Sequence, residues 1–179
     1  MATTKTIPSR GDVANNSQTS RSLISILLAF VIAPSAFAVD SSCEAVLAAS
    51  EARIAQPNWH SISELAGGAP VEMIKANGQF FSQRGGKWTK FPVNIDDAER
   101  ILIAQIRNGA AKLSECKVVG RDVIDGMPVT VVSSRTELKG AAPADAKLYI
   151  GKLDGLPYRQ IAARVSVVYR YKGVVAPAL

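Results

Sequence analysis

The sequence has little of what catalytic and metal sites are usually built from. It contains one histidine, His60, and two cysteines, with no CxxC pair and no GxSxG motif. A Ser-His-Asp triad would have to use His60, whose neighbours form no motif, and no cluster of His, Cys, Asp and Glu suggests a metal. Its paired glycines lack the GxxxxGKS/T spacing of a phosphate-binding loop. We therefore expect a protein that is not an enzyme and uses no cofactor.

An apolar run long enough to cross a membrane is also missing. The most apolar segment, Leu23–Ala33, is well short of the roughly 18 residues that a transmembrane helix needs. Three basic residues precede it, and the sequence AFA at 36–38 puts small residues at the two positions that signal peptidase reads. We therefore expect residues 1–38 to be a signal peptide cleaved after Ala38, which predicts a periplasmic protein.

Neither a twin-arginine export motif nor a lipidation motif occurs. Cys43 follows Asp-Ser-Ser, without the apolar and small residues that a lipidation site requires. The part expected to remain, residues 39–179, suffices for one domain with a real core. The net charge of +6 at pH 7 is mild and spread along the chain. It is compatible with contact with an anionic membrane surface, and the predicted compartment argues against nucleic acid as a partner.

Both cysteines, Cys43 and Cys116, belong to the predicted exported part of the chain. Two thiols in an oxidising compartment usually form one disulfide. A metal or redox pair is the competing interpretation, but the spacing and the single histidine do not support it. We predict a Cys43–Cys116 disulfide.

Two segments have the pattern of helices. Residues 43–55 carry a loose helical stripe, which Pro57 ends. The clearer helix follows Asn94, which is a good N-cap, and acidic residues fill its first turn. Gly109 closes this helix.

Short strands make up most of the remaining chain. Residues 60–65 alternate in polarity, and residues 71–91 read as a three-strand meander with turns at Asn77-Gly78 and Gly85-Gly86. About four more strands follow the second helix. Runs of strands without βαβ alternation predict an antiparallel α+β fold, in which a strongly curved sheet is covered by two helices.

A nearly repeated sequence, DGMP at 125–128 and DGLP at 154–157, lies among these later strands. Each copy stands between runs rich in Val, Ile and Tyr, and its glycine adopts positive φ without a Cβ penalty. The proline that follows lacks a backbone donor, which is tolerated at the start of a strand or on an edge. The repeat predicts two hairpins of similar design and carries no ligand-binding chemistry of its own.

Several aromatic residues fall on the predicted strands. Such residues on a curved sheet usually pack in the core or in cross-strand pairs. The alternative is that some line an apolar cavity between sheet and helices. For that role the candidates are Phe81, Trp88, Tyr149 and Tyr169.

Three stretches resemble periplasmic proteins of the LolA/LolB-like superfamily, which includes the carriers that sort outer-membrane lipoproteins. They are VEMIKANGQFFSQRGGKWTKF, LYIGKLDGLPYRQ and the closing VSVVYRYKGVVAP. The resemblance implies an unclosed β-barrel, or half-barrel, lidded by helices, with an apolar cavity that holds acyl chains in the carriers. This chain has fewer aromatic residues than expected of a carrier and is shorter, and no carrier cavity residue matches it by motif.

Two functions follow from these observations. In the first, the chain is a non-enzymatic binding protein whose cavity takes a lipid, an acyl chain or a lipidated protein. In the second, side chains fill the interior, and the chain is a protein-interaction or envelope-sensing domain without a small ligand. A solvent-accessible apolar cavity would favour the first function, and a packed interior with an exposed apolar edge would favour the second.

Overall fold

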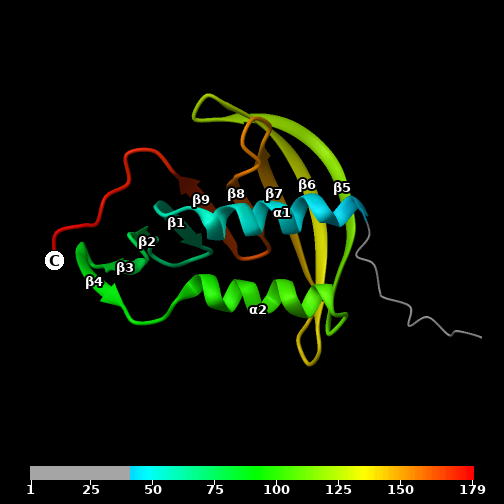
Figure 1. The fold of residues 1–179 in the computed structure, drawn as a ribbon, viewed down its shortest axis with the longest axis horizontal. Helices are drawn as coiled ribbons and strands as arrows, with labels where there is room; N and C mark the ends of the chain where they lie inside the picture. The colour runs from blue at the N-terminus through cyan, green and yellow to red at the C-terminus, as the bar shows by residue number, and fades with distance from the viewer. Residues whose placement is uncertain (1–40) are drawn as a thin grey trace, which may run out of the picture. The chain divides into compact units, whose positions relative to one another are not determined.

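The computed structural model describes residues 41–179, and the predicted signal peptide with its cleavage site lies outside these residues (Figure 1). In chain order the elements are α1 (Ser41–Ala55), β1 (Trp59–Leu65), β2 (Val71–Ala76), β3 (Gln79–Arg84), β4 (Lys87–Phe91), α2 (Ile95–Arg107), β5 (Ala111–Ile124), β6 (Met127–Leu138), β7 (Ala144–Gly151), β8 (Pro157–Ala162) and β9 (Val165–Arg170).

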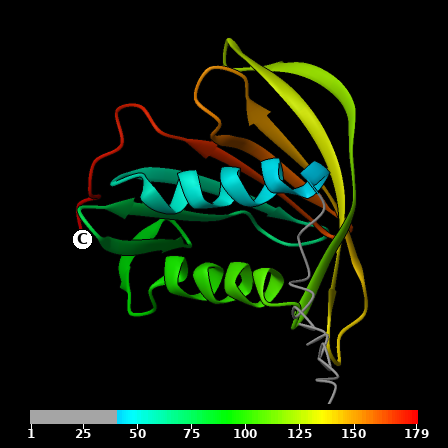
Figure 2. The same ribbon diagram turned by 45° about the vertical axis from the view of Figure 1, so that its right-hand side comes forward.

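All nine of these strands belong to one antiparallel sheet with the order β4-β3-β2-β1-β9-β8-β7-β6-β5. Its end strands, β4 and β5, are not paired with each other, so the sheet is not closed into a barrel. Figures 1 and 2 show α1 and α2 on the same side of the strongly bent sheet. We call that side the inner face and the opposite side the outer face. The predicted α+β half-barrel covered by two helices is confirmed.

Helix α2 forms as its sequence predicts. The side chain of Asn94 accepts a hydrogen bond from the backbone N–H of Asp96 at 3.1 Å, which satisfies one of the free donors of the first turn. Ile103 and Ile106 are buried on one face of the helix, and Arg107 occupies its last turn. The apolar face therefore packs towards the sheet, and charged residues cover the opposite face.

An irregularity in β5 brings the two cysteines together. Leu113 of β5 is buried in the core between helices and sheet, and strict alternation from it would turn Cys116 to the outer face. The pairing of β5 with β6 shifts between Ser114 and Lys117, where Glu115 has a φ of 55°. The extra residue turns Cys116 inward, and it forms a disulfide with Cys43 of α1. The predicted disulfide is confirmed.

The two DG sequences form different turns. Asp125 and Gly126, with φ of 49° and 78°, make a two-residue hairpin between β5 and β6. The second copy lies in a longer loop between β7 and β8, where the Asp154 side chain accepts a hydrogen bond from the backbone of Leu156 at 3.1 Å. Both hairpins exist as predicted, but their design is not the same. The proline after each turn stands at or next to the start of its strand.

Candidate functional site

A pocket of about 490 Å³ lies between the two helices and the inner face of the sheet, and we call it the inner pocket. Both helices form its roof, and residues of β1, β2 and the strands β5 to β9 form its floor. The roof is mainly apolar, with Val46 and Leu47 from α1 and Leu102, Ile103 and Ile106 from α2. The volume falls within the range of about 300–1,000 Å³ that is typical of small-molecule sites.

The floor of the inner pocket mixes apolar side chains with hydroxyl and amide groups. Leu148 and Val167 supply apolar surface there. The polar members are Ser61, Ser63, Ser134, Thr136 and Gln160. A ligand in this pocket would therefore meet hydrocarbon on the helix side and scattered hydrogen-bonding groups on the sheet side.

Strand pairing explains which side chains reach the inner pocket. In β1, Ser61 pairs with Tyr169 of β9 and Ser63 pairs with Val167, and all four line the pocket. Side chains alternate between faces, so His60, which immediately precedes Ser61, is on the outer face. There it lies 2.9 Å from a carboxylate oxygen of Glu72, which makes it a surface ion-pair or hydrogen-bond partner.

Three buried charged side chains, Arg53, Lys75 and Asp96, form a cluster with the partly exposed Glu99 beside the inner pocket. Lys75 of β2 lies 2.6 Å from a carboxylate oxygen of Asp96 and also donates to the backbone carbonyl of Ile54 at 2.8 Å. Arg53 of α1 forms an ion pair with Glu99 of α2, and it lies 3.7 Å from Asp96. The cluster joins the last turn of α1, strand β2 and the first turns of α2. Arg53 and Glu99 also line the inner pocket.

The guanidinium of Arg53 is also held by two aromatic rings. It lies 5.0 Å from the ring centre of Trp59 and 5.6 Å from that of Tyr169, within the range of cation–π contacts. Burial raises the pKa of the Tyr169 hydroxyl, and the positive charge of Arg53 opposes this effect only in part. Tyr169 is therefore an uncharged hydroxyl in the wall of the pocket at neutral pH.

The structure places the four predicted aromatic candidates in three different environments. Tyr169 lines the inner pocket. Phe81 and Trp88 belong to a cluster on the outer face, with Ile74, Ala76 and Val174 of the C-terminal tail. Tyr149 is also on the outer face, where the guanidinium of Arg159 lies 6.0 Å from its ring centre. A role for each of the four in ligand binding stays a prediction, and only Tyr169 is next to the inner pocket.

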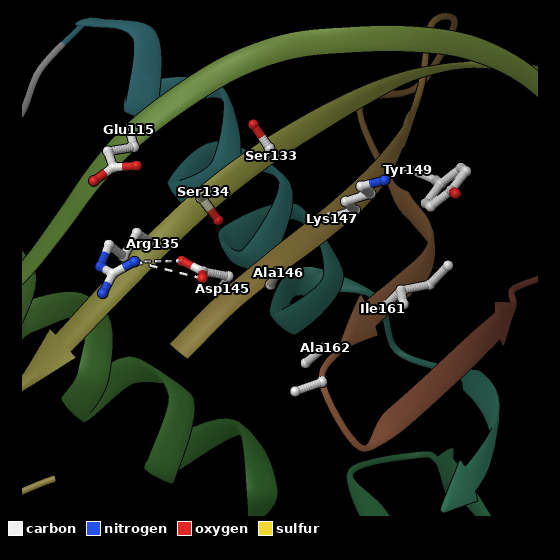
Figure 3. Close-up of a pocket in the computed structure, with 11 residues that line it drawn as sticks. Glu115, Ser133, Ser134, Arg135, Asp145, Ala146, Lys147, Tyr149, Ile161 and Ala162 are labelled. Atoms are coloured by element: carbon white, nitrogen blue, oxygen red, sulfur yellow. Dashed lines mark hydrogen bonds and ion pairs between the residues drawn. The ribbon is translucent and has the colours of Figure 1, made fainter. Parts of the chain in front are cut away.

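A second pocket, of about 590 Å³, lies on the outer face over β6, β7 and β8 (Figure 3). Figure 3 shows Arg135 directed towards Asp145, and the two form an ion pair at 3.2 Å. Tyr149 lines this outer pocket, and Lys147 and Asp145 in its wall are exposed. A hollow with paired charges and exposed walls is a weaker candidate for an apolar ligand than the inner pocket.

Sequence reasoning missed the charged cluster. It treated Asp96 and Glu99 as residues that favour the start of α2, which accounts for their position but not for their burial. A signal was present in β2, where alternation puts Lys75 on the same face as Met73, which lines the inner pocket. A lysine directed into the interior needs a carboxylate partner, and Asp96 supplies it.

No helix within residues 41–179 is long and apolar enough to span a membrane. No group of three or more His, Cys, Asp and Glu side chains in that part is placed to hold a metal ion.

No protein-family model matches the chain, and no curated protein matches its sequence. Solved structures do match. The crystal structure of LprF from Mycobacterium bovis has a TM-score of 0.51 at 14% sequence identity, covering 76% of this chain and 96% of LprF. The crystal structure of the Mycobacterium tuberculosis lipoprotein LppX has a TM-score of 0.52 at 11% identity, covering 76% of this chain and 98% of LppX.

These likenesses show that the chain shares its fold with LprF and LppX over nearly the whole of both proteins. At 14% and 11% sequence identity, the likeness shows the fold alone.

Proposed function

We propose that this chain is an exported, non-enzymatic binding protein that holds an acyl chain of a lipid or of a lipidated protein. The observation that carries this proposal is the inner pocket of about 490 Å³, which has an apolar roof of Leu47, Leu102, Ile103 and Ile106. It lies where the predicted fold places a cavity, between the sheet and its helices. The shared fold with the lipoprotein LppX supports an envelope role.

Burial of hydrocarbon alone supplies enough free energy for useful affinity. Each methylene removed from water contributes about 0.8 kcal/mol, so about ten methylenes contribute roughly 8 kcal/mol before the costs of association. A dissociation constant of 1 μM corresponds to about 8 kcal/mol. About fifteen buried methylenes contribute roughly 12 kcal/mol, so a membrane-lipid chain held along both helices reaches micromolar affinity without a charged anchor after an association cost of about 4 kcal/mol.

The proposed location is the periplasm, since the sequence from the basic residues through Ala38 has the pattern of a signal peptide. Intact-mass analysis of the exported protein is expected to show a chain that begins at Val39 and carries no lipid on Cys43. A retained leader or a lipid adduct would contradict this part of the proposal.

Binding is tested with N-phenyl-naphthylamine, an uncharged dye whose fluorescence rises in apolar surroundings. Ala98 of α2 is exposed and lines the inner pocket, so Ala98→Trp places an indole at its opening. Ala104 is also exposed on α2 but lies outside the pocket lining, and Ala104→Trp is the matched control. We expect the dye to bind the wild type and Ala104→Trp, and to bind Ala98→Trp at least about tenfold more weakly.

The outer face supplies a further comparison. Trp88 packs in the outer cluster with Phe81, so Trp88→Gln is expected to leave dye affinity unchanged in a folded protein. If Trp88→Gln abolishes binding and Ala98→Trp does not, the site is on the outer face and the inner-pocket proposal is wrong.

A second candidate function is an interaction with a protein, and one observation favours it. Strand β5 is at one end of the sheet order, and its Val118, Val119 and Val123 are 69%, 51% and 62% exposed. An exposed apolar edge strand is a surface to which a partner strand adds. Absence of dye binding by a folded protein, together with a partner captured by the wild type and lost in Val118→Lys, would favour this function.

A further inference from the structure

One end of the inner pocket is polar. Ser61 of β1, Tyr169 of β9, Arg53 of α1 and Glu99 of α2 all line the pocket there, and we call these four residues the polar end. Ser61 pairs directly with Tyr169 across the sheet, Arg53 lies over the Tyr169 ring, and Arg53 is ion-paired with Glu99. The four side chains therefore converge on one region of the pocket.

Ser61 presents its hydroxyl group to the inner pocket. It is only 4% exposed, and within residues 41–179 its side chain makes no hydrogen bond. The Tyr169 hydroxyl likewise forms no hydrogen bond to another residue of that part. Neither oxygen is among the fully enclosed, unpaired polar atoms of residues 41–179, so solvent reaches both hydroxyl groups. Two hydroxyl groups without a hydrogen-bond partner in the described chain, at one end of the pocket, are therefore available to a ligand atom.

The charges of the polar end are already balanced. Arg53 and Lys75 face Asp96 and Glu99 in one cluster, which holds two charges of each sign. A ligand carboxylate would add a third negative charge beside Glu99, and Arg53 would have to release Glu99 or Asp96 to pair with it. A buried charge without its own partner is strongly disfavoured.

From these observations we propose that the polar end binds the uncharged head of an acyl ester and discriminates against the carboxylate of a free fatty acid. This inference rests on the proposed function and specifies its ligand. The ester oxygens accept hydrogen bonds from the hydroxyls of Ser61 and Tyr169, while the acyl chain extends beneath Leu102 and Ile103. Acyl esters occur both in glycerolipids and in the lipid part of lipoproteins, and the test separates these two sources.

The test is displacement of N-phenyl-naphthylamine from the full exported protein at neutral pH, below the concentrations at which the competitors form micelles. We expect monopalmitoylglycerol to displace the dye at a concentration at least about tenfold lower than palmitate does. A synthetic diacylglyceryl-cysteine peptide is run in parallel. Tighter binding of this peptide identifies a lipoprotein source, and tighter binding of monopalmitoylglycerol identifies a free lipid.

Two variants test which residues cause the preference for the acyl ester over palmitate. Glu99→Gln removes one negative charge with little change of shape, and it is expected to raise the affinity for palmitate to that for the ester. Ser61→Ala is expected to weaken ester binding by about threefold to tenfold. Ser133 of β6 hydrogen-bonds the backbone carbonyl of Lys117 and does not line the inner pocket, so Ser133→Ala is the matched control and is expected to change neither affinity.

The outcomes separate this inference from the proposed function. Equal displacement by palmitate and the ester in the wild type overturns the inference and leaves acyl binding intact. So does a folded Glu99→Gln protein whose affinity for palmitate is unchanged. If Glu99→Gln does not fold, the inference is tested by comparing palmitate with the ester in the wild type and by measuring ester affinity in Ser61→Ala. Failure of the dye and of the ester to bind a folded wild type overturns both proposals.

Discussion

At the scale of single residues, Gly151 occupies a position that has no room for a side chain. A Cβ there would lie 2.8 Å from a ring carbon of Tyr158, and it would also clash with the Asp154 carboxylate that accepts the Tyr158 hydrogen bond. We expect Gly151→Ala to lower the free energy of unfolding by about 1–3 kcal/mol, because the ring and the carboxylate must move.

Gly120 is the matched control for this prediction. A Cβ at Gly120 meets only a methyl carbon of Val131, at 4.0 Å, and its backbone does not require glycine. Chemical denaturation of Gly151→Ala and Gly120→Ala compares the two sites. Similar losses of stability in both variants would show that the packing around Tyr158 is not the cause.

Two tyrosines near the turn at 154–157, Tyr158 and Tyr171, make the free energy of unfolding depend on pH in the alkaline range. Burial, followed by the hydrogen bond to Asp154, raises the pKa of Tyr158 from 10.0 to about 12. Burial also raises the pKa of Tyr171, whose hydroxyl donates to the carbonyl of Pro157 at 2.5 Å. Because these hydroxyls ionise more easily in the unfolded chain, their contribution is fully present below pH 10 and is lost above it.

We therefore expect the free energy of unfolding to fall as the pH rises from about 10 to about 12, and to fall less steeply in Tyr158→Phe. The variant also loses about 1 kcal/mol at neutral pH with its hydrogen bond. Urea denaturation at a series of pH values measures both effects. A Tyr158→Phe protein with the wild-type slope would exclude Tyr158 as a source of the pH dependence.

The alternation of polar and apolar residues predicted where strands lie, but it did not predict which face of the sheet each side chain occupies. Phe81 and Tyr169 are both aromatic residues within strands, yet Phe81 is on the outer face and Tyr169 lines the inner pocket. A shift of one residue reverses every face, and the face of each strand depends on pairing with a distant strand. Tyr169 is fixed by its pairing with Ser61, which lies more than 100 positions away in the chain.

At the scale of elements, the buried charges hold α1, β2 and α2 together. Removal of the Lys75 ammonium leaves the Asp96 carboxylate buried beside Arg53 alone and leaves the Ile54 carbonyl without its donor. We expect Lys75→Met to lower the free energy of unfolding by about 3–5 kcal/mol.

The control for this prediction is Lys112→Met. Lys112 pairs with Glu137 at 3.4 Å, but the two side chains are 67% and 41% exposed. Such surface pairs contribute about 0–1 kcal/mol, so we expect Lys112→Met to be nearly neutral. Thermal and urea unfolding of both variants measure the difference, and an equally mild effect of Lys75→Met would contradict the role given to the cluster.

The disulfide joins α1 to β5 across 73 positions of sequence. On the chain-entropy model a loop of this length contributes about 4 kcal/mol. We expect the double variant Cys43→Ala/Cys116→Ala to lose stability of that order, and the oxidised protein to show no free thiol when it is titrated under denaturing, non-reducing conditions. Two free thiols in protein recovered from the periplasm would reject the bond in the natural setting.

The elements themselves were largely predictable from local sequence. Asn94 and the acidic residues after it mark the start of α2, and Asn77-Gly78 marks the turn between β2 and β3, because these signals act within a few residues. The bulge at Glu115 was not predictable. The bulge turns Cys116 towards Cys43 of α1, and the position of α1 beside β5 is set by tertiary packing and not by local sequence.

At the scale of the whole molecule, the pairing of β1 with β9 brings the two ends of the domain together in the middle of the sheet. This contact turns two meanders into one curved surface, and the two helices cover its inner face (Figure 2). No local pattern predicts such a pairing. The fold class followed from the order of elements, and the half-barrel followed from the resemblance to the LolA/LolB-like superfamily.

The central claim is that the inner pocket binds an acyl ligand, and methyl NMR tests it most directly. Methyl groups of Leu102, Leu148 and Val167 line the pocket, whereas those of Ile74 and Val118 lie outside it. On addition of monopalmitoylglycerol, we predict saturable shifts of the first three residues with the last two nearly unchanged. No shifts, or shifts confined to Ile74 and Val118, would contradict the claim.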